Sequence, residues 1–263
     1  MARSTKSVDY QKVARPVAAL VDEYPPGFVD PKHSHPRAQL LFATAGVMTI
    51  STSEASFVVP PQRALWIPPN LEHEAVCRGA VSLKTLYVDM NARPNLPKTC
   101  RAIEVSNLLR ELIVEATLLP IEYDEGGRGG RIMNLILDEI TATPAAPLHV
   151  PMPTDARLAR ASKAILADPA DAKTLDDWAR AVNMGRRTFT RLFRQQTGMS
   201  FAAWRQHVRL MEALARLATG QRVTNVAFDI GYNSPSAFTA MFRRTFGVSP
   251  SHYFEGVDDT GAD

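Results

Sequence analysis

The alternation of apolar and polar positions separates a strand-rich first part of the chain from a helical remainder. Between residues 16 and about 90, short apolar runs are separated by turns that contain glycine or proline. Many short strands punctuated in this way predict a sandwich or a barrel. Residues 1–15 are mostly polar and are expected to form a loose arm. The clearest expected strands are residues 37–44, 46–51, 55–59, 64–67 and 81–88.

A helical period begins after the expected strands. Two apolar stripes at helical spacing predict amphipathic helices over about 104–117 and 128–143, with the glycine-rich residues 125–130 between them. Helices that follow a small barrel in this way are expected to cap it. The stripes consist of Leu108, Leu109, Leu112, Ile113 and Ala116 in the first helix and of Ile132, Leu135, Ile136 and Ile140 in the second.

A proline-rich segment is the clearest boundary in the chain. Four prolines lie among the eleven residues from Thr143 to Pro153. Because proline lacks a backbone N–H, the segment is expected to form neither helix nor strand-ladder hydrogen bonds. It should therefore be an extended, semi-rigid spacer.

The stretch after the spacer contains one pattern twice. The sequence Phe189-Thr-Arg-Leu-Phe193 is echoed 49 residues later by Phe238-Thr-Ala-Met-Phe242, and each copy continues to a glycine and a serine. Thr174 is expected to cap a helix that starts at Leu175, and Ser234 followed by Pro235 is expected to open the second helix of the second copy. Further helices are expected over residues 155–167 and 201–218.

This repeat predicts a pair of helix-turn-helix motifs. Phe189, Leu192 and Phe193 have the spacing of a buried helix face. The opposite face carries arginine and threonine, which suit the DNA major groove because Arg pairs with guanine and neutralises phosphates. The alternative is a small helical bundle with a solvated Arg face.

The charge distribution supports a nucleic-acid partner for the second half of the chain. The 263 residues carry a net charge of +3, but residues 155–255 hold fifteen Lys and Arg against eight Asp and Glu. Cys77 and Cys100 form no CxxC pair, so no disulfide framework or cysteine zinc site is indicated. The first ten residues lack the apolar core of a signal peptide, and no apolar run is long enough to span a bilayer. A cytoplasmic protein without a membrane role is expected.

From about Pro153 to Phe254 the sequence resembles the AraC/XylS family of bacterial transcription regulators. The paired motifs carry the resemblance, together with the closing segment Phe246-Gly-Val-Ser-Pro-Ser-His-Tyr253. The resemblance implies a sequence-specific regulator that binds double-stranded DNA as a homodimer, with RNA polymerase as a candidate partner. It also implies that the two helices after the barrel form the dimer contact as well as capping the barrel; capping alone stays open. The candidate dimer residues are Leu108, Leu109, Leu112, Ile113, Leu135 and Ile136.

The two expected recognition helices differ in their DNA-facing residues. The first offers arginine and threonine and is expected to read base edges, whereas the second offers small residues and is expected to set register and add backbone affinity. Two rigidly joined motifs should enter successive major grooves, which predicts a site of two boxes about one helical turn apart. The candidate DNA contacts are Arg186, Arg187, Thr188, Thr190, Arg191 and Arg194 in the first motif, and Ser234, Ser236, Ala237, Ala240, Arg243 and Arg244 in the second.

A histidine pattern lies within the expected strands. His33, His35, Gln39 and His73 are spaced like the two motifs of cupins of the RmlC type, in which histidines and a carboxylate hold a metal. Gln39 stands where the carboxylate is usual, which weakens the expected affinity for hard ions. Three imidazoles can still bind Zn²⁺ or a similar divalent transition metal. Otherwise these residues line an effector pocket or are hydrogen-bonded loop residues, and no cofactor is required.

The expected fold is α+β with two domains. An all-β cupin-like barrel with two following helices precedes an all-α double helix-turn-helix. The expected parts are an arm (1–15), a sensor barrel (16–98), a helical segment (99–142), a spacer (143–154), the DNA-binding domain (155–256) and a disordered tail (257–263).

A transcription regulator modulated by a small-molecule effector in the barrel fits these parts, and no catalytic residue is indicated. One alternative is a metal-dependent cupin enzyme tethered to a DNA-binding domain. Another is a constitutive dimeric regulator without an effector.

Overall fold

A computed structural model of the chain describes residues 7–61, 63–146 and 148–254. The chain divides into two compact units: an N-terminal unit of residues 1–50 and 59–148, and a C-terminal unit of residues 51–58 and 149–263. The first unit is a β-sheet with helices and the second is mainly helical, so the predicted α+β fold class is confirmed. The expected tail lies outside the described residues. Among the described residues, no helix combines the length and apolarity needed to cross a membrane.

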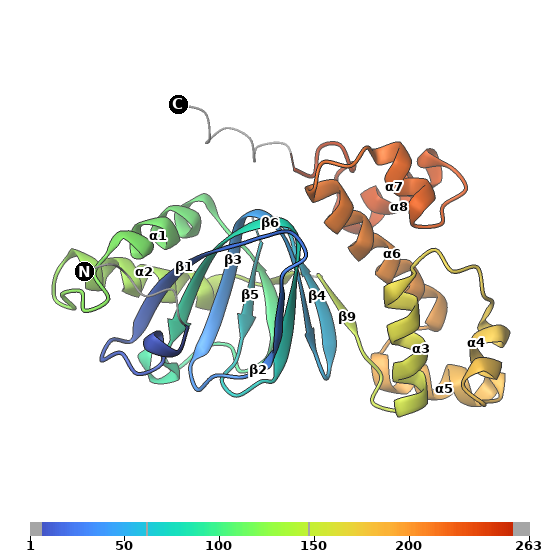
Figure 1. The fold of residues 1–263 in the computed structure, drawn as a ribbon, viewed down its shortest axis with the longest axis horizontal. Coiled ribbons are helices and arrows are strands. Elements are labelled where there is room, and N and C mark those ends of the chain that lie inside the picture. The colour runs from blue at the N-terminus through green and yellow to red at the C-terminus, as the bar shows by residue number, and fades with distance from the viewer. Residues whose placement is uncertain (1–6, 62, 147, 255–263) are drawn as a thin grey trace. The chain divides into compact units, whose positions relative to one another are not determined.

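The N-terminal unit is built on one antiparallel sheet that curves around its own interior (Figure 1). Its strand order is β1-β6-β3-β5-β7-β8, and β2 pairs with β6. A short 3₁₀ helix, η2 (Met90–Ala92), follows β6. The strands are β1 (Val17–Tyr24), β2 (Val29–His33), β3 (Ala38–Thr52), β5 (Arg63–Ile67), β6 (His73–Val88), β7 (Arg101–Glu104) and β8 (Ala145–Ala146).

The strands β3 and β6 are longer than the short strands that the sequence predicts. Residues 37–44 and 46–51 were expected as two strands, but β3 runs through Gly46 without a break. Gly46 has a φ of +74° and Gly79 in β6 a φ of +78°. The two glycines therefore bend continuous strands where the sequence suggests a turn.

The two faces of the sheet have different roles, and the alternation of side chains along each strand determines which residue faces where. Leu40 and Phe42 of β3 pack in a hydrophobic core beneath α1 (Asn107–Leu118) and α2 (Arg128–Ala142). Gln39 and Leu41 point to the other side, where a cavity lies. Both helices match the sequence prediction, and Figure 1 shows them on one side of the sheet.

The helices α1 and α2 bury most of the residues expected at a dimer contact. Leu109, Leu112, Ile113 and Ile136 lie in the core between the helices and the sheet. Their burial within the chain leaves little of these four side chains for a second copy, so the dimer contact stays a prediction that they support weakly. Leu108 and Leu135 remain candidates, since they are 53% and 47% exposed.

Residues 7–15 are not a loose arm. Residues Ser7–Tyr10 form a 3₁₀ helix, η1, and the Tyr10 side chain is fully buried, with its ring centroid 6.3 Å from that of Tyr87. Arg15 forms an ion pair of 3.0 Å with Glu122. The buried Tyr10 ring and this ion pair hold the segment against the rest of the unit. The polar composition of the segment did not indicate these contacts. Residues 1–6 of the expected arm lie outside the described residues.

The proline-rich segment contains two short strands, which corrects the expectation that it makes no ladder hydrogen bonds. In the N-terminal unit β8 pairs with β7. In the C-terminal unit β9 (His149–Pro151) pairs with β4 (Ala55–Val59), so that Ala55 lies opposite Pro151. Residues between the prolines keep their N–H groups, so short ladders form there.

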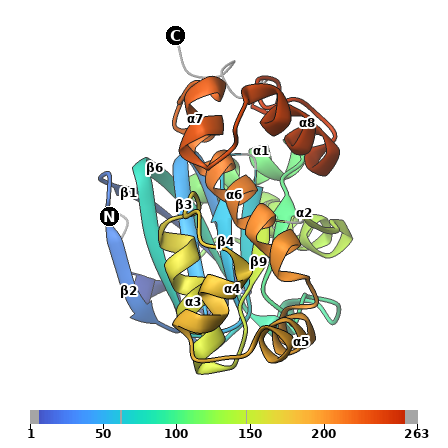
Figure 2. The same cartoon turned by 90° about the vertical axis from the view of Figure 1, so that its right-hand side faces the viewer.

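Six helices make up most of the C-terminal unit. The long helix α6 runs between α3–α5 at one end and α7–α8 at the other (Figure 2). The repeat appears in the caps: Gly198 ends α5 and Gly247 ends α8, both in the left-handed conformation. The helices are α3 (Ala156–Ala167), α4 (Leu175–Ala181), α5 (Arg186–Thr197), α6 (Phe201–Ala218), α7 (Val223–Asp229) and α8 (Pro235–Phe246).

A candidate DNA-binding face and a candidate effector cavity

The first helix-turn-helix motif consists of α4 and α5. Thr174 and Asp177 form a reciprocal capping box at the start of α4, which confirms the predicted cap and adds a partner for it. The turn between the helices contains Asn183 in the left-handed conformation, with a φ of 53°. This geometry reverses the chain within a few residues and sets α5 across α4.

An aromatic cluster holds α5 in place. Phe189 and Phe193 are fully buried, and Phe193 meets Phe201 and Trp204 edge to face at centroid distances of 5.2 and 5.4 Å. Such pairs add about 0.5–1.5 kcal/mol each beyond area burial. They fix which face of α5 is turned outward.

The outward face of α5 carries the predicted DNA-contact residues. Arg187, Thr188, Arg191 and Arg194 are exposed on it. The Thr190 hydroxyl donates a hydrogen bond to the carbonyl oxygen of Arg186 at 3.0 Å, so within the chain it already has a partner. This places a row of guanidinium groups on one side of a helix, a suitable arrangement for phosphates and guanine edges.

Arg186 differs from the other α5 arginines because an acid holds it. Its guanidinium lies 2.7 Å from the Asp176 carboxylate at the start of α4. Asp176 lies in the first turn of α4. The pairing needs the turn geometry, since the two residues are ten positions apart.

The second motif, α7 and α8, presents a less polar face. Ser236, Ala237 and Ala240 are exposed on α8, and Arg243 and Arg244 follow them. The Ser234 hydroxyl caps α8 by accepting a hydrogen bond from the Ala237 N–H at 3.2 Å, as predicted. Phe238 and Phe242 are buried, as are their counterparts in α5. The repeat thus produces the same helix placement with different outer residues.

Arg209 of α6 bridges the two motifs, which the sequence did not indicate. Its Nε donates to the carbonyl of Pro169 at 3.0 Å, ahead of α4, and its Nη1 donates to the carbonyl of Gly231 at 3.3 Å, ahead of α8. One side chain therefore ties the loop before the first motif to the turn inside the second. This helps to hold the two recognition helices in a fixed spacing.

A cavity of about 340 Å³ lies within the N-terminal unit. Alternate residues of β1, β3 and β6 point into it, as expected for one face of a sheet. Tyr87 lies in its wall, whereas Trp66 and Phe42 are core residues. The lining residues are Asp22, Tyr24, Phe28, Asp30, His33, Gln39, Leu41, Met48, His73, Ala75, Leu83, Thr85 and Tyr87.

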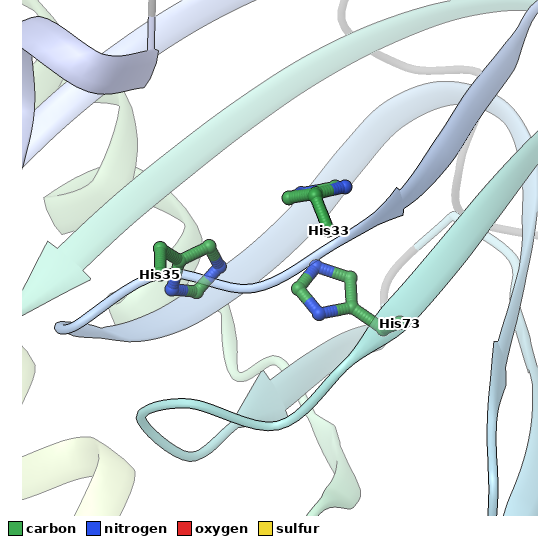
Figure 3. A group of neighbouring side chains, drawn as sticks. All are labelled: His33, His35 and His73. Atoms are coloured by element: carbon green, nitrogen blue, oxygen red, sulfur yellow. The ribbon is translucent and has the colours of Figure 1, made fainter.

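The three predicted histidines converge beside this cavity (Figure 3). His33 ends β2, His35 lies in the following loop and His73 begins β6. Their candidate ligand atoms lie within 4.8 Å of one another. The sequence spacing therefore identified a true cluster, brought together by the pairing of His33 with His73.

Each imidazole is oriented by a backbone carbonyl through its Nδ1 atom. The distances are 2.8 Å from His33 to Pro31, 2.6 Å from His35 to Arg37 and 2.9 Å from His73 to Leu71. In His33 and His73 a bond of this kind places the proton on Nδ1 and leaves the Nε2 lone pair for a ligand, whereas the Nε2 of His35 already faces the Gln39 side chain. Burial lowers the pKa of His73 to about 4, so this ring is neutral at pH 7. The three residues can hold a metal ion of the kind that prefers imidazole, such as Zn²⁺.

Gln39 occupies the position beside the cluster that a metal-binding carboxylate would take. Its Oε1 lies 2.7 Å from His35 Nε2, and its Nε2 lies 3.4 Å from the Tyr87 hydroxyl. The amide therefore links the histidines to the cavity wall. It brings no charge to the cluster.

An acidic group that the sequence did not single out lies in the same cavity. The Tyr24 hydroxyl donates to Asp22 Oδ2 at 3.1 Å, and Asp30 also lines the wall. Burial raises the pKa of Asp22, and burial together with the neighbouring Asp22 raises the pKa of Tyr24. The sequence could have indicated Asp22 and Tyr24, because they follow the buried Leu20 by two and four residues. This spacing places all three on the same strand face.

Comparison with known proteins assigns these features to a class. The AraC-like ligand-binding domain family matches residues 16–132, and a helix-turn-helix domain family matches residues 178–256. The chain is therefore a DNA-binding transcription regulator with a ligand-binding domain, not an enzyme.

The similar proteins identify the family. The chain is 32% identical to the HTH-type transcriptional regulator NimR of Escherichia coli over 223 residues, which cover 85% of this chain and 81% of NimR. It belongs to the AraC family of transcriptional regulators. The crystal structure of unsaturated-fatty-acid-bound ToxT from Vibrio cholerae is similar at 12% identity and a TM-score of 0.40, covering 96% of this chain and 99% of that one. The DNA-binding domain of AdpA, solved with a target DNA, is 31% identical over 39% of this chain and 96% of that one, with a TM-score of 0.37.

Proposed function

We propose that the chain binds a specific DNA sequence and that a small-molecule effector in the N-terminal cavity changes this binding. The observation that carries the proposal is the cavity of about 340 Å³ in a chain that also holds two helix-turn-helix motifs. Ligand pockets of this size combine an apolar wall with a few polar groups that orient the ligand. The regulator acts on chromosomal DNA in the cytoplasm.

The proposed DNA site has two boxes about one helical turn apart. Helix α5 reads base edges through Arg187 and Arg191, while Arg243 and Arg244 of α8 hold phosphates. The support is geometric: these residues are exposed, while the aromatic residues behind them are buried. A homodimer would double this site, with Leu108 and Leu135 as its exposed apolar contacts.

A second candidate ligand for the cavity is a divalent transition metal at His33, His35 and His73. The observation that favours it is the Nδ1 bond of every ring to a carbonyl, which is the usual orientation of metal-binding histidines. Metal analysis of the purified chain tests this candidate. The variant His73→Gln should lose the metal, while the control His252→Gln, which changes a histidine outside the cluster, should keep it.

Selection of genomic fragments by the purified full chain, followed by sequencing, tests the DNA half of the proposal. We expect enrichment of a two-box site at near-physiological salt. Diffuse binding without a motif that weakens steeply with salt would contradict it, since nonspecific phosphate contacts behave in this way.

The effector half needs a second measurement on the selected site. Compounds that stabilise the chain are added, and the DNA affinity and transcription from the target promoter are measured. A compound that binds the cavity should change both, and substitution of Leu41→Trp, which fills the cavity, should remove the response. If no cavity ligand alters either quantity, the chain is a regulator without an effector.

A further inference from the structure

The charged groups of the cavity wall are acidic. Among the thirteen lining residues none is Lys or Arg, and the two carboxylates are Asp22 and Asp30. In the described part of the chain Asp22 has no ion pair with a basic side chain; its hydrogen-bond partner is the Tyr24 hydroxyl. A partly buried carboxylate without a cation is unfavourable, and a positively charged partner relieves that cost.

The other polar groups of the wall are well placed to accept hydrogen bonds. His73 is 2% exposed, and its Nδ1 is bonded to the Leu71 carbonyl. Its Nε2 atom has no hydrogen bond among the described residues, so its lone pair is left for a ligand. A ligand that carries N–H donors would satisfy this atom and the acids together.

The rest of the wall suits an organic body. The rings of Tyr24 and Phe28 stack at a centroid distance of 4.6 Å, and Leu41 and Met48 add apolar surface from β3. Aromatic faces attract a nearby cation as well as apolar groups. A bare metal ion at the histidines would use none of these contacts and would leave the Asp22 carboxylate without a cation.

We propose that the cavity selects a small organic cation, a protonated amine on an apolar or aromatic body. The ammonium group lies between Asp22 and Asp30, and the body packs against Tyr24 and Phe28. Carboxylates and phosphates are disfavoured because the wall offers them no Lys or Arg and two like charges. The regulatory meaning of this ligand class rests on the proposed function, but binding itself does not.

Calorimetry on the full chain with three probes of matched shape tests the class. The probes are 2-phenylethylamine, 2-phenylethanol and 3-phenylpropionate, measured with EDTA present so that metal plays no part. We expect the amine to bind at least about tenfold more tightly than the alcohol, as for a partly buried charge pair. We expect no detectable binding of the carboxylate.

Variants of neighbouring acids assign the binding to the cavity. Asp22→Asn should weaken the amine about tenfold or more and should leave the alcohol unchanged. Glu23→Gln is the matched control, since Glu23 is the next residue of β1, is exposed and does not line the cavity. Asp30→Asn provides a second loss variant if Asp22→Asn fails to fold.

Three outcomes overturn the inference. The carboxylate or the alcohol binds as tightly as the amine; Asp22→Asn and Asp30→Asn both leave amine binding unchanged; or the amine does not bind, while Zn²⁺ titrated in a separate experiment without EDTA does. The proposed function fails differently. If an uncharged or anionic effector changes DNA binding, the regulator stands and only the ligand class is wrong. If amines bind the cavity without any effect on DNA binding, the class stands and effector control is wrong.

Discussion

Trp204 donates its indole N–H to the carbonyl oxygen of Pro151 across 2.7 Å. The ring is fully buried in the aromatic cluster of α5 and α6, so the bond joins strand β9 to the core of the C-terminal unit. One turn further along α6, His207 Nε2 lies 2.8 Å from the carbonyl oxygen of His149. The segment that looked like a spacer in the sequence is thus attached to the helix that links the two DNA-binding motifs.

The Trp204 bond predicts a difference between two tryptophan variants. Trp204→Phe keeps an aromatic ring but leaves the partly buried Pro151 carbonyl without its donor, which should destabilise the protein by about 1–3 kcal/mol. Trp178→Phe is the control, because the Trp178 indole N–H is buried without a hydrogen-bond partner in the described chain. Its replacement should cost clearly less. Urea unfolding followed by far-ultraviolet circular dichroism measures both, and equal losses would mean that the bond contributes nothing.

The His207 contact predicts a pH dependence. Burial lowers the pKa of His207 below its ordinary value of about 6.5. The unfolded chain therefore takes up a proton at a higher pH than the folded chain does. Stability from this group is complete above about pH 6.5 and declines as the pH falls below it. Unfolding free energies at pH 7.5 and 5.5 should differ less in His207→Gln than in the parent, and an unchanged difference would exclude the role.

Local chemistry explains why much of the helical unit could be predicted from the sequence. Thr174, Ser234 and the glycines at 198 and 247 act within one helical turn of their own positions, so their roles can be read without the fold. The ion pair between Arg186 and Asp176 required the turn between two helices. Arg209 required the placement of three separate segments.

The cavity residues also divide into those that the sequence indicates and those that need the fold. The histidines could be found because a motif spacing resembles a known one, although the spacing did not reveal the backbone carbonyls that orient their rings. Asp22 and Tyr24 enter the cavity because Asp22 pairs with Leu83 in the register of β1 and β6. Such a long-range register depends on the whole sheet. The sequence likewise divided β3 into strands 37–44 and 46–51, since a glycine alone does not show whether a strand ends or continues.

Gly46 provides a test of the bent strand. A side chain there would be strained by the positive φ and would overlap the carbonyl oxygen of Ala80. Gly27 is the matched control, since its φ of +76° is similar but no atom lies within 4 Å of an added Cβ. Both alanine variants should lose about 1 kcal/mol from the backbone. In thermal unfolding, Gly46→Ala should lose clearly more stability than Gly27→Ala. Similar losses would show that the strand shifts to accommodate the added Cβ without a further loss of stability.

Asp176 is expected to restrain DNA binding. Its carboxylate neutralises Arg186 and places a negative charge beside the face proposed to meet phosphates. Asp176→Asn should therefore increase affinity for all DNA sequences several-fold at low salt and steepen the salt dependence. Asp168→Asn, which removes an acid outside this ion pair, is the control. Fluorescence anisotropy over a salt series measures both, and a weaker complex for Asp176→Asn would instead show that the pair positions Arg186 for contact.

Arg191 and Arg244 separate base reading from phosphate binding. Arg191 lies on the exposed face of α5 opposite the buried Phe189 and Phe193, whereas Arg244 lies near the end of α8, where its guanidinium approaches Met241 Sδ at 3.1 Å. Arg191→Ala should cost about 1–3 kcal/mol on the selected site and should relax preference at one base pair. Arg244→Ala should weaken selected and random DNA alike, because a phosphate contact carries no base information. Repeating the fragment selection with each variant distinguishes the two. An unchanged motif with Arg191→Ala and a changed one with Arg244→Ala would assign base reading to α8.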